Sequence, residues 1–375
     1  ADGVQGPGHG GVAGGGQQPP QPDHLLVQLA GVEVQGGLTQ ILGDILGYLI
    51  LAHLQMIHPT SSKGGRILFA PAIGLCHFLG KHNPELLLKI RYFLTFKKKL
   101  NLKDPQDLNE KILWAKLYSD TTQWTTLADK YKVRDYVEQK GLGDCLVKLY
   151  GAWDDVNDFD FDQLPENFIL KANNGDGKGT NKAVRGKSTL PIAQKAAIVK
   201  TIDEWLHRKN IGLLHVEPHY KEIHPMVIAE ELLPTPKGES TLVDYKLWCF
   251  NGKVHYILIC SDRSGNGSKV HLMLYDREWN ACPQYSIFSS GYPKGKIMPK
   301  PKNLEKMIEV AEKLSQGFPE LRVDLYNLNP EDENGKIYFG ELTFTSLGGL
   351  MTYFTPEFLK KAGALFSIKD FKKKV

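Results

Sequence analysis

The sequence has few cysteines, and their spacing excludes two kinds of site. A disulfide framework or a zinc site needs paired or closely spaced cysteines, whereas this chain has an odd number and no CxxC spacing. We therefore expect free thiols in a reducing compartment, each behaving as a small buried hydrophobic residue. The five cysteines are Cys76, Cys145, Cys249, Cys260 and Cys282.

The chain also lacks the features of a nucleic-acid-binding, secreted or membrane-spanning protein. Its net charge at pH 7 is only +4, and its central region has no dense basic block interleaved with aromatic residues. Residues 1–22 lack the basic segment and apolar core of a signal peptide. An apolar stretch at residues 41–57 is interrupted by polar side chains and is too short to span a membrane. We expect a cytoplasmic protein with no nucleic-acid partner.

Length and composition are those of a globular protein with a poorly ordered beginning. The 375 residues are enough for two or three domains. Residues 1–37 are rich in glycine, proline and glutamine and have too few large apolar side chains to order themselves. We interpret residues 1–62 as a low-complexity and apolar extension, either disordered or an artefact of the gene model, and assign no function to it.

Apolar periodicity predicts several helices. One is expected to begin with Asp104 as its cap and Pro105 as its first residue. Others are expected at residues 128–139, at residues 190–209, and after Asn303 as a cap.

Residues 84–103 form a basic amphipathic stretch. We interpret it as a helix that covers the core while its lysines extend into solvent. Peripheral contact with the anionic inner face of a membrane is the less favoured alternative.

Short apolar runs predict strands, and one pair of runs has a clear turn. Asn251-Gly252 separates two apolar runs, which is the strongest short signal for a β-hairpin. The runs lie at residues 146–153, 168–171, 226–229, 244–250, 254–260, 321–325 and 337–344.

A glycine-rich loop follows one of these strands and is the first candidate site. Lys171 ends the strand, and residues 173–180 contain too much glycine to form a helix or a strand. Alternating glycines let backbone N–H groups turn toward one point, and a lysine beside them adds positive charge, so the pair suits a polyphosphate. A hairpin tip with solvated lysines is the alternative, because neither a P-loop nor a dinucleotide fingerprint is present.

A carboxylate pair on the last two predicted strands is the second candidate site. If Pro330 pairs with Gly335 at the loop, then Asp324 lies opposite Glu341, with Cβ atoms roughly 5 Å apart. Two carboxylates at that spacing favour a divalent cation such as Mg²⁺ between them. A tight turn at Asn334-Gly335 would separate them instead, and a solvent-facing pair neutralised by neighbouring cations is a further alternative.

The order of these features resembles a known family. The sequence is similar to the TupA-like branch of the ATP-grasp superfamily, which is associated with bacterial teichuronopeptide and surface-polysaccharide biosynthesis. The resemblance covers residues 82–366. Its motifs are LNLKDPQDLNEKILWAKLYSD (100–120), LADKYKVRDYV (127–137), FILKANNGDGKG (168–179), IAEELL (228–233), DYKLWCFNGK (244–253), LRVDLYN (321–327) and YFGELTFT (338–345).

The resemblance implies an α+β fold in which two lobes clamp ATP. The implied parts are a helical N-terminal region at 63–145, a small lobe with the glycine loop at 146–235, a large lobe with the Mg²⁺ site at 236–366, and a basic tail at 367–375.

The resemblance also implies an ATP site. Lys171 and Lys246 match the phosphate-binding lysines, and Lys130 or Lys132 matches an N-terminal lysine near the phosphates, with Lys132 kept as the candidate. Glu230 and Glu231 match the hinge that binds the adenine edge. The remaining implied contacts are Asn174, Gly175, Gly177, Lys178 and Gly179 of the loop and Leu233 beside the hinge.

Asp324 and Glu341 match the Mg²⁺ ligands of the family, and Arg322 matches a residue that stabilises the transferred phosphoryl group. The implied catalytic set is then Arg322, Lys246 and Lys171. Thr343 takes the third ligand position, where ATP-grasp enzymes usually have asparagine. The glycine loop also departs from the family, because Asn174 and Asp176 stand where related sequences tend to have histidine and serine.

The implied activity is ATP-dependent ligation of a carboxylate to an amine through an acyl-phosphate, on small-molecule or polymer substrates. A kinase or glycosyltransferase-associated transferase acting on a sugar, and a nucleotide-binding module without turnover, are the alternatives. No motif identifies the donor or the acceptor.

Overall fold

The computed structural model describes residues 63–175, 179–235, 239, 241–264 and 269–374. The chain divides into two compact units, residues 1–75 and 76–375, and helix α3 (Lys63–His82) runs across their boundary. Both β-sheets lie within the second unit. In the described part of the chain, no helix combines the length and apolar character needed to cross a bilayer.

After α3, further α-helices precede the first strand in the described part of the chain. They are α4 (Pro84–Phe96), α5 (Leu108–Tyr118), α6 (Thr122–Ala128) and α7 (Val133–Gln139). In α4 the apolar residues Leu87, Leu88 and Ile90 are buried, which fits a helix that covers the core. The helix ends before Lys97, whose φ of 55° is left-handed, so the lysine run at 97–99 follows the helix and is exposed.

Two predicted helix starts are wrong, and an aspartate explains each. The cap of α5 is Asp107 rather than Asp104, because the Asp107 side chain accepts the Glu110 N–H at 2.9 Å. The predicted helix at 128–139 is interrupted after Ala128. There the Asp129 carboxylate accepts the backbone N–H groups of Tyr131 and Lys132, which forms a turn before α7 begins.

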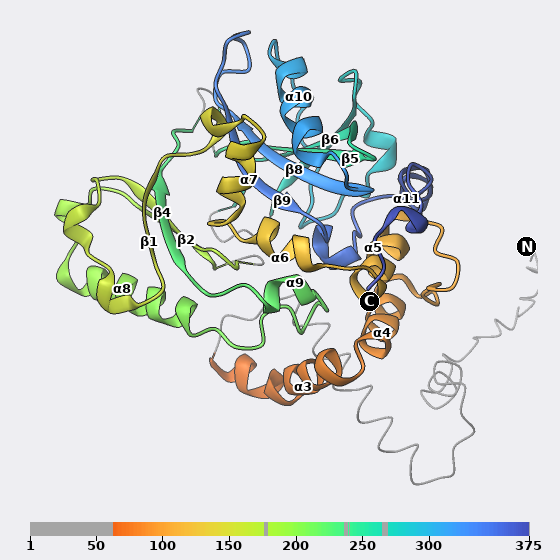
Figure 1. Ribbon diagram of the computed structural model, residues 1–375, viewed down its shortest axis with the longest axis horizontal. Coiled ribbons are helices and arrows are strands. Elements are labelled where there is room, and N and C mark those ends of the chain that lie inside the picture. The colour runs from red at the N-terminus through yellow and green to blue at the C-terminus, as the bar shows by residue number, and fades with distance from the viewer. Residues whose placement is uncertain (1–62, 176–178, 236–238, 240, 265–268, 375) are drawn as a thin grey trace, which may run out of the picture. The chain divides into compact units, whose positions relative to one another are not determined.

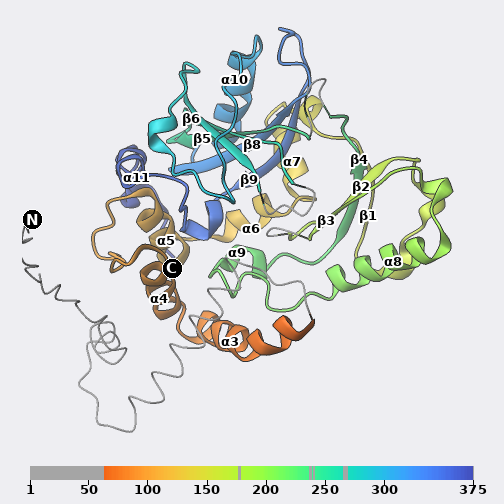
Figure 2. The same cartoon turned by 180° about the vertical axis from the view of Figure 1, so that it is seen from behind.

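The first sheet has four antiparallel strands in the order β1-β4-β2-β3. Their bounds are β1 Leu149–Trp153, β2 Phe168–Ala172, β3 Asn181–Val184 and β4 Val227–Glu231. Helix α8 (Ile192–Leu206) lies along this sheet, with Ile198, Ile202 and Trp205 buried against its apolar side chains (Figure 1). The view from behind shows β3 beside β2, at the edge of the sheet (Figure 2).

The second sheet has five antiparallel strands in the order β7-β6-β5-β8-β9. The predicted hairpin is confirmed: Asn251 and Gly252, with φ of 49° and 74°, connect β5 to β6. The strand bounds are β5 Asp244–Phe250, β6 Lys253–Ser261, β7 His271–Asp276, β8 Glu320–Asn327 and β9 Ile337–Thr343.

Helix α10 (Leu304–Ser315) packs on one face of this sheet, and α11 (Pro356–Gly363) belongs to the apolar cluster on the other face (Figure 1). Asn303 precedes α10 as predicted, but its amide does not cap the helix. It donates to Asn327 and to the Gly335 carbonyl, because the loop between β8 and β9 lies beside it. A short helix, α9 (Pro218–Lys221), lies between α8 and β4 in the sequence.

The cysteines are free thiols, as predicted. Four of them are buried and Cys145 is half-buried. The fold as a whole is α+β, with helices preceding and covering two antiparallel sheets.

Candidate functional site

Strand β8 has opposite chemistry on its two faces, because successive side chains alternate across a sheet. Leu321, Val323 and Leu325 belong to the apolar cluster that includes α10. Arg322 and Asp324 lie on the other face and are also buried. The candidate site is therefore built on a polar stripe inside an otherwise apolar sheet.

Neighbouring strands extend this stripe. Lys246 on β5 pairs in register with Asp324 on β8, and Asp324 pairs with Glu341 on β9. Arg322 pairs with Thr343 in the same way. The predicted opposition of Asp324 and Glu341 is thus confirmed, and the tight-turn alternative is wrong.

The loop pairing assumed for that prediction is nevertheless wrong, and a β-bulge corrects the register. Asn327 pairs with Ile337 near the loop, one residue away from the assumed register. The register shifts between Asp324 and Leu325, where Gly340 is the extra residue on β9. A Cβ on Gly340 would lie 3.0 Å from the Asp324 carbonyl oxygen, so the bulge favours glycine there. Without the bulge, Asp324 would face Gly340 instead of Glu341.

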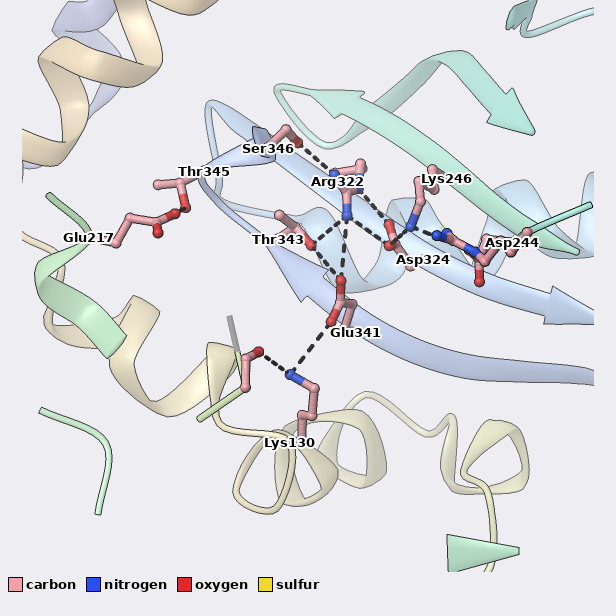
Figure 3. A network of polar contacts seen from close by, with 12 residues as sticks. Lys130, Glu217, Asp244, Lys246, Arg322, Asp324, Glu341, Thr343, Thr345 and Ser346 are labelled. Carbon is pink, nitrogen blue, oxygen red and sulfur yellow. Dashed lines mark hydrogen bonds and ion pairs between the residues drawn. The ribbon is translucent and has the colours of Figure 1, made fainter. Parts of the chain in front are cut away.

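Asp324 is held by two cations. Its Oδ1 accepts Arg322 Nε at 2.6 Å, and its Oδ2 accepts Arg322 Nη2 at 2.8 Å and Lys246 Nζ (Figure 3). Burial alone would raise the pKa of Asp324, but Arg322 and Lys246 outweigh it and lower the pKa to about 2. The carboxylate is therefore ionised at any physiological pH, as a metal ligand must be.

Glu341 is held more loosely than Asp324. Its Oε1 accepts Thr343 Oγ1 at 3.3 Å and lies 3.5 Å from Arg322 Nη2, while its Oε2 lies 3.7 Å from Lys130 Nζ (Figure 3). Its side chain is 37% exposed, against 6% for Asp324. Thr343 Oγ1 also accepts Arg322 Nη2 at 3.0 Å. The predicted Mg²⁺ ligands Asp324, Glu341 and Thr343 therefore share Arg322 as a hydrogen-bond donor.

The four-stranded sheet contributes a second cluster of charge. Both carboxylate oxygens of Glu230 have a cation partner, Lys171 Nζ at 2.7 Å and Arg134 Nη1 at 3.0 Å. The structure thus places two predicted nucleotide contacts, Lys171 and Glu230, against each other. Glu231 lies one residue further along β4, where its backbone N–H donates to the Lys148 carbonyl, and Leu233 is buried.

The base of the glycine loop is fixed by side chains that were not predicted. Asn173 is fully buried and donates to Asp129 at 3.0 Å and to the His224 carbonyl at 2.9 Å. Its Oδ1 accepts the Met226 N–H at 2.8 Å. Asn173 therefore ties the loop to both α6 and the start of β4.

The loop beyond Asn173 fits an anionic ligand. Asn174 is 1% exposed, and within the described residues neither atom of its amide has a hydrogen-bond partner. An unpaired buried amide costs roughly 1–3 kcal/mol, which a bound polar ligand would recover. A Cβ on Gly175 would overlap Thr180, and Gly179 has a φ of 83°, so both positions favour glycine. The predicted loop contacts Gly177 and Lys178 lie outside the described residues, and so does Asp176.

The structure brings Lys130, and not Lys132, into the site. Lys130 Nζ donates to the Gly175 carbonyl at 2.8 Å and reaches toward Glu341 (Figure 3). The Lys132 side chain is exposed. The two lysines are two residues apart in the sequence, and the turn at Asp129 decides which of them faces the carboxylates.

The segment after β9 adds residues that the sequence did not identify. Ser346 accepts Arg322 Nη1 at 3.0 Å, and Thr345 donates to the buried Glu217 (Figure 3). Leu347 and Gly348 have left-handed φ values of 48° and 63°. The Gly348-Gly349 pair after a strand is the one sequence signal that could have indicated this turn.

The histidines near the site differ in burial and in their neighbours. His219 is buried, and burial and the nearby Lys116 lower its pKa to about 3, so its ring is neutral. The pKa of His215 is also lowered, by burial and by Arg91 and Lys116. His224 is exposed and lies 3.3 Å from Asp154.

The residues present suit a nucleotide with magnesium. Asp324 and Glu341 offer hard oxygen atoms, and Lys246 and Lys130 lie beside them. The unpaired Asn174 amide is next in sequence to Gly175, whose carbonyl accepts Lys130 Nζ. Among the described residues, no group of three or more histidine, cysteine, aspartate or glutamate side chains could hold a metal ion, so Asp324 and Glu341 stand as a pair.

Comparison with known proteins gives one sequence match and several distant structural ones. Residues 110–367 match a protein-family model described as TupA-like ATPgrasp. No curated protein matches the chain. D-alanine–D-alanine ligase from Bacillus anthracis matches with 13% identity and a TM-score of 0.40, over 68% of this chain and 67% of the ligase.

The same ligase complexed with ATP matches with 14% identity and a TM-score of 0.37, over 68% of this chain and 66% of the ligase. ATP-grasp ligase PsnB, complexed with a phosphomimetic variant of its minimal precursor, Mg and ADP, matches with 11% identity and a TM-score of 0.34, over 76% and 71%. The chain thus spans about two thirds of the D-alanine ligase. With TM-scores below 0.5 these structural likenesses are distant, whereas the family model covers well over half of the chain.

Proposed function

Because the chain belongs to the TupA-like ATP-grasp family, we propose that it is an ATP-dependent carboxylate–amine ligase. The observation that carries this proposal is the row formed by Lys246, Asp324 and Glu341, joined through Lys130 to the glycine loop. Such a row supports phosphoryl transfer, which depends on positioned cations and hard oxygen ligands rather than on a covalent group of the protein.

The nucleotide would be held by residues from both sheets. Lys171, Lys246 and the glycine loop at Asn174 and Gly175 would bind the phosphates, and the segment after Glu231 would adjoin the adenine. Asp324, Glu341 and Thr343 would hold Mg²⁺, which neutralises phosphate charge when it is bound.

Arg322 is the residue best placed to stabilise the developing charge. Its guanidinium is buried and is oriented by Asp324, Thr343 and Ser346, so it needs no rearrangement at the moment of reaction. In the proposed reaction a substrate carboxylate oxygen attacks the γ-phosphorus, and ADP leaves. An amine then attacks the acyl carbon of the acyl-phosphate, phosphate leaves, and the nitrogen loses a proton.

The proposed setting is bacterial cell-surface polysaccharide or teichuronopeptide biosynthesis, with small-molecule or polymer substrates. We propose the cytoplasm as its location, since the chain carries free thiols. A nucleotide-binding module without turnover is the second candidate, because Thr343 replaces the usual amide ligand and its hydroxyl is already bonded to Arg322.

Release of ADP tests the proposal. The purified chain would be incubated with ATP and Mg²⁺ and a panel of amino acids, uronic acids and amines, alone and in pairs. Turnover that needs both a carboxylate and an amine supports the ligase. Turnover with a sugar alone would indicate a sugar kinase, and nucleotide binding without any turnover would indicate the non-catalytic module.

A further inference from the structure

Lys130 connects the glycine loop to the carboxylate pair. Its Nζ donates to the Gly175 carbonyl at 2.8 Å and lies 3.7 Å from Glu341 Oε2. Its backbone N–H donates to the Asn173 carbonyl at 3.0 Å, and its side chain is only 13% exposed. The ammonium therefore contacts both the loop that follows β2 and a side chain of β9.

The charges around the carboxylate pair sum to a positive value. Asp324 and Glu341 are in contact with three cations, Arg322, Lys246 and Lys130. The neighbouring Asp244 lies 4.0 Å from Lys246 Nζ but is also paired with Arg263, so that Asp244 and Arg263 together add no net charge. An excess of positive charge at a buried site opposes a divalent cation and favours a polyphosphate.

The two carboxylates differ in how firmly the cations hold them. Asp324 is buried and accepts two short hydrogen bonds from Arg322 as well as one from Lys246. Glu341 is more exposed, and its cation contacts are at 3.5 and 3.7 Å. Removal of Lys130 would therefore change the surroundings of Glu341 far more than those of Asp324.

We propose that Lys130 is a positioning residue that holds Glu341 until the phosphates of a nucleotide take its ammonium, so that the metal binds with the nucleotide and not before it. This inference rests on the proposed function, because it takes the ligand to be a nucleotide. It assigns to Lys130 control over the order of binding.

Manganese provides a probe for this order, because its binding can be followed by electron paramagnetic resonance without any turnover. The nucleotide-free full chain is titrated with Mn²⁺ as wild type, Lys130→Met and Lys132→Met. We expect Lys130→Met to bind Mn²⁺ at least about fivefold more tightly than wild type, which is the lower end of typical coupling between sites. Lys132→Met is the matched control, since its side chain is exposed two residues away, and should titrate like wild type.

Two further variants show that the gained binding is at the proposed site. Adding Glu341→Gln to Lys130→Met should remove the gain, because it removes the ligand that Lys130 had held. Lys130→Arg keeps the charge and should stay close to wild type. If Lys130→Met does not fold by circular dichroism, Lys130→Gln takes its place.

Equal Mn²⁺ affinity in wild type and Lys130→Met, or an equal gain in Lys132→Met, would overturn the inference. ADP binding to the wild type, followed by tryptophan fluorescence, separates this failure from that of the proposed function. If ADP does not bind, the nucleotide proposal itself is wrong. If ADP binds but Lys130→Met leaves Mn²⁺ affinity unchanged, only the role of Lys130 is wrong.

Discussion

The two faces of strand β8 are equally buried but differ completely in chemistry. Leu321 and Val323 pack with α10, while Arg322 and Asp324 between and beside them form charged hydrogen bonds on the opposite face. Burial of each large aliphatic side chain contributes roughly 1.5–3 kcal/mol to stability. A buried ion pair contributes little net stability, because the loss of hydration offsets the attraction. The comparison indicates that the apolar face stabilises the fold, whereas the presence of charged residues on the other face is explained by the ligand binding proposed for them.

The charged face itself contains two carboxyl groups with opposite behaviour. Glu320 and Asp324 lie on one face of β8 on either side of Arg322. Burial raises the pKa of Glu320 to about 8, although Arg322 partly opposes this. Burial also acts on Asp324, yet Arg322 and Lys246 lower its pKa to about 2. The number of close cations, and not burial, decides which of the two is ionised.

Asp324→Asn should give the largest effect, because it removes the more firmly held carboxylate of the charged face. We expect ATP turnover to fall by at least about 1,000-fold, equivalent to about 4 kcal/mol in the barrier. Mg²⁺-dependent ADP release measures it, with exposed Glu333→Gln from the β8–β9 loop as a control that should retain activity. Wild-type turnover in Asp324→Asn would contradict the metal assignment.

Leu321→Ala should lower stability without removing the site, since it affects the opposite face. The cavity and lost burial should reduce the free energy of unfolding by about 3 kcal/mol. Urea unfolding measures it, and Ile192→Ala, at a position that is 88% exposed, should change stability by less than about 0.5 kcal/mol. Equal losses in both variants would contradict the packing of β8 on α10.

Glu320→Gln should remove a pH dependence of stability. The folded-state pKa of Glu320 is raised, so between its usual pKa and about 8 the folded state binds a proton that the unfolded state has released. Stability is then greatest below that range and falls as pH rises, by about 2 kcal/mol between pH 5.5 and 7. Urea unfolding at several pH values should show this slope in wild type and a flatter one in Glu320→Gln. Parallel slopes would show that Glu320 is not the group responsible.

Lys171→Ala should have the smallest effect, because other cations remain near the phosphates. We expect ADP affinity to fall about tenfold, or about 1.4 kcal/mol. Lys182→Ala is the control, since Lys182 is exposed on the adjoining strand β3 opposite Leu170. Fluorescence titration with ADP compares the two variants. A larger loss of ADP affinity in Lys182→Ala than in Lys171→Ala would contradict the assignment of Lys171 as a phosphate contact.

Much of the local structure followed from short sequence patterns. The Asn251-Gly252 hairpin and the strand ending near Lys171 were predicted because turn chemistry and apolar alternation act over a few residues. The prediction of one helix at 128–139 was wrong for an equally local reason, which the apolar periodicity does not reveal. A single buried aspartate, Asp129, bonds two backbone N–H groups and breaks the helix.

The carboxylate pair shows that counting residues back from a loop does not determine the register of two strands. The opposition of Asp324 and Glu341 was predicted from a loop pairing that does not exist, and it holds because Gly340 forms a bulge. Neither Ser346 nor Glu217 lies in a recognisable sequence motif. Ser346 bonds to Arg322, and Glu217 bonds to Thr345, because the segment after β9 turns back toward Arg322.

The sequence alone determined which side chains share a face, because alternation along a strand has a period of two and needs no knowledge of the rest of the fold. In the strand β8 this period puts Arg322 and Asp324 on one face and Leu321 and Val323 on the other. Only the tertiary structure decided that Lys130, and not Lys132, meets Glu341. Contact between residues so distant in the chain depends on how the turn at Asp129 and two separate sheets are packed, and no local pattern records that packing.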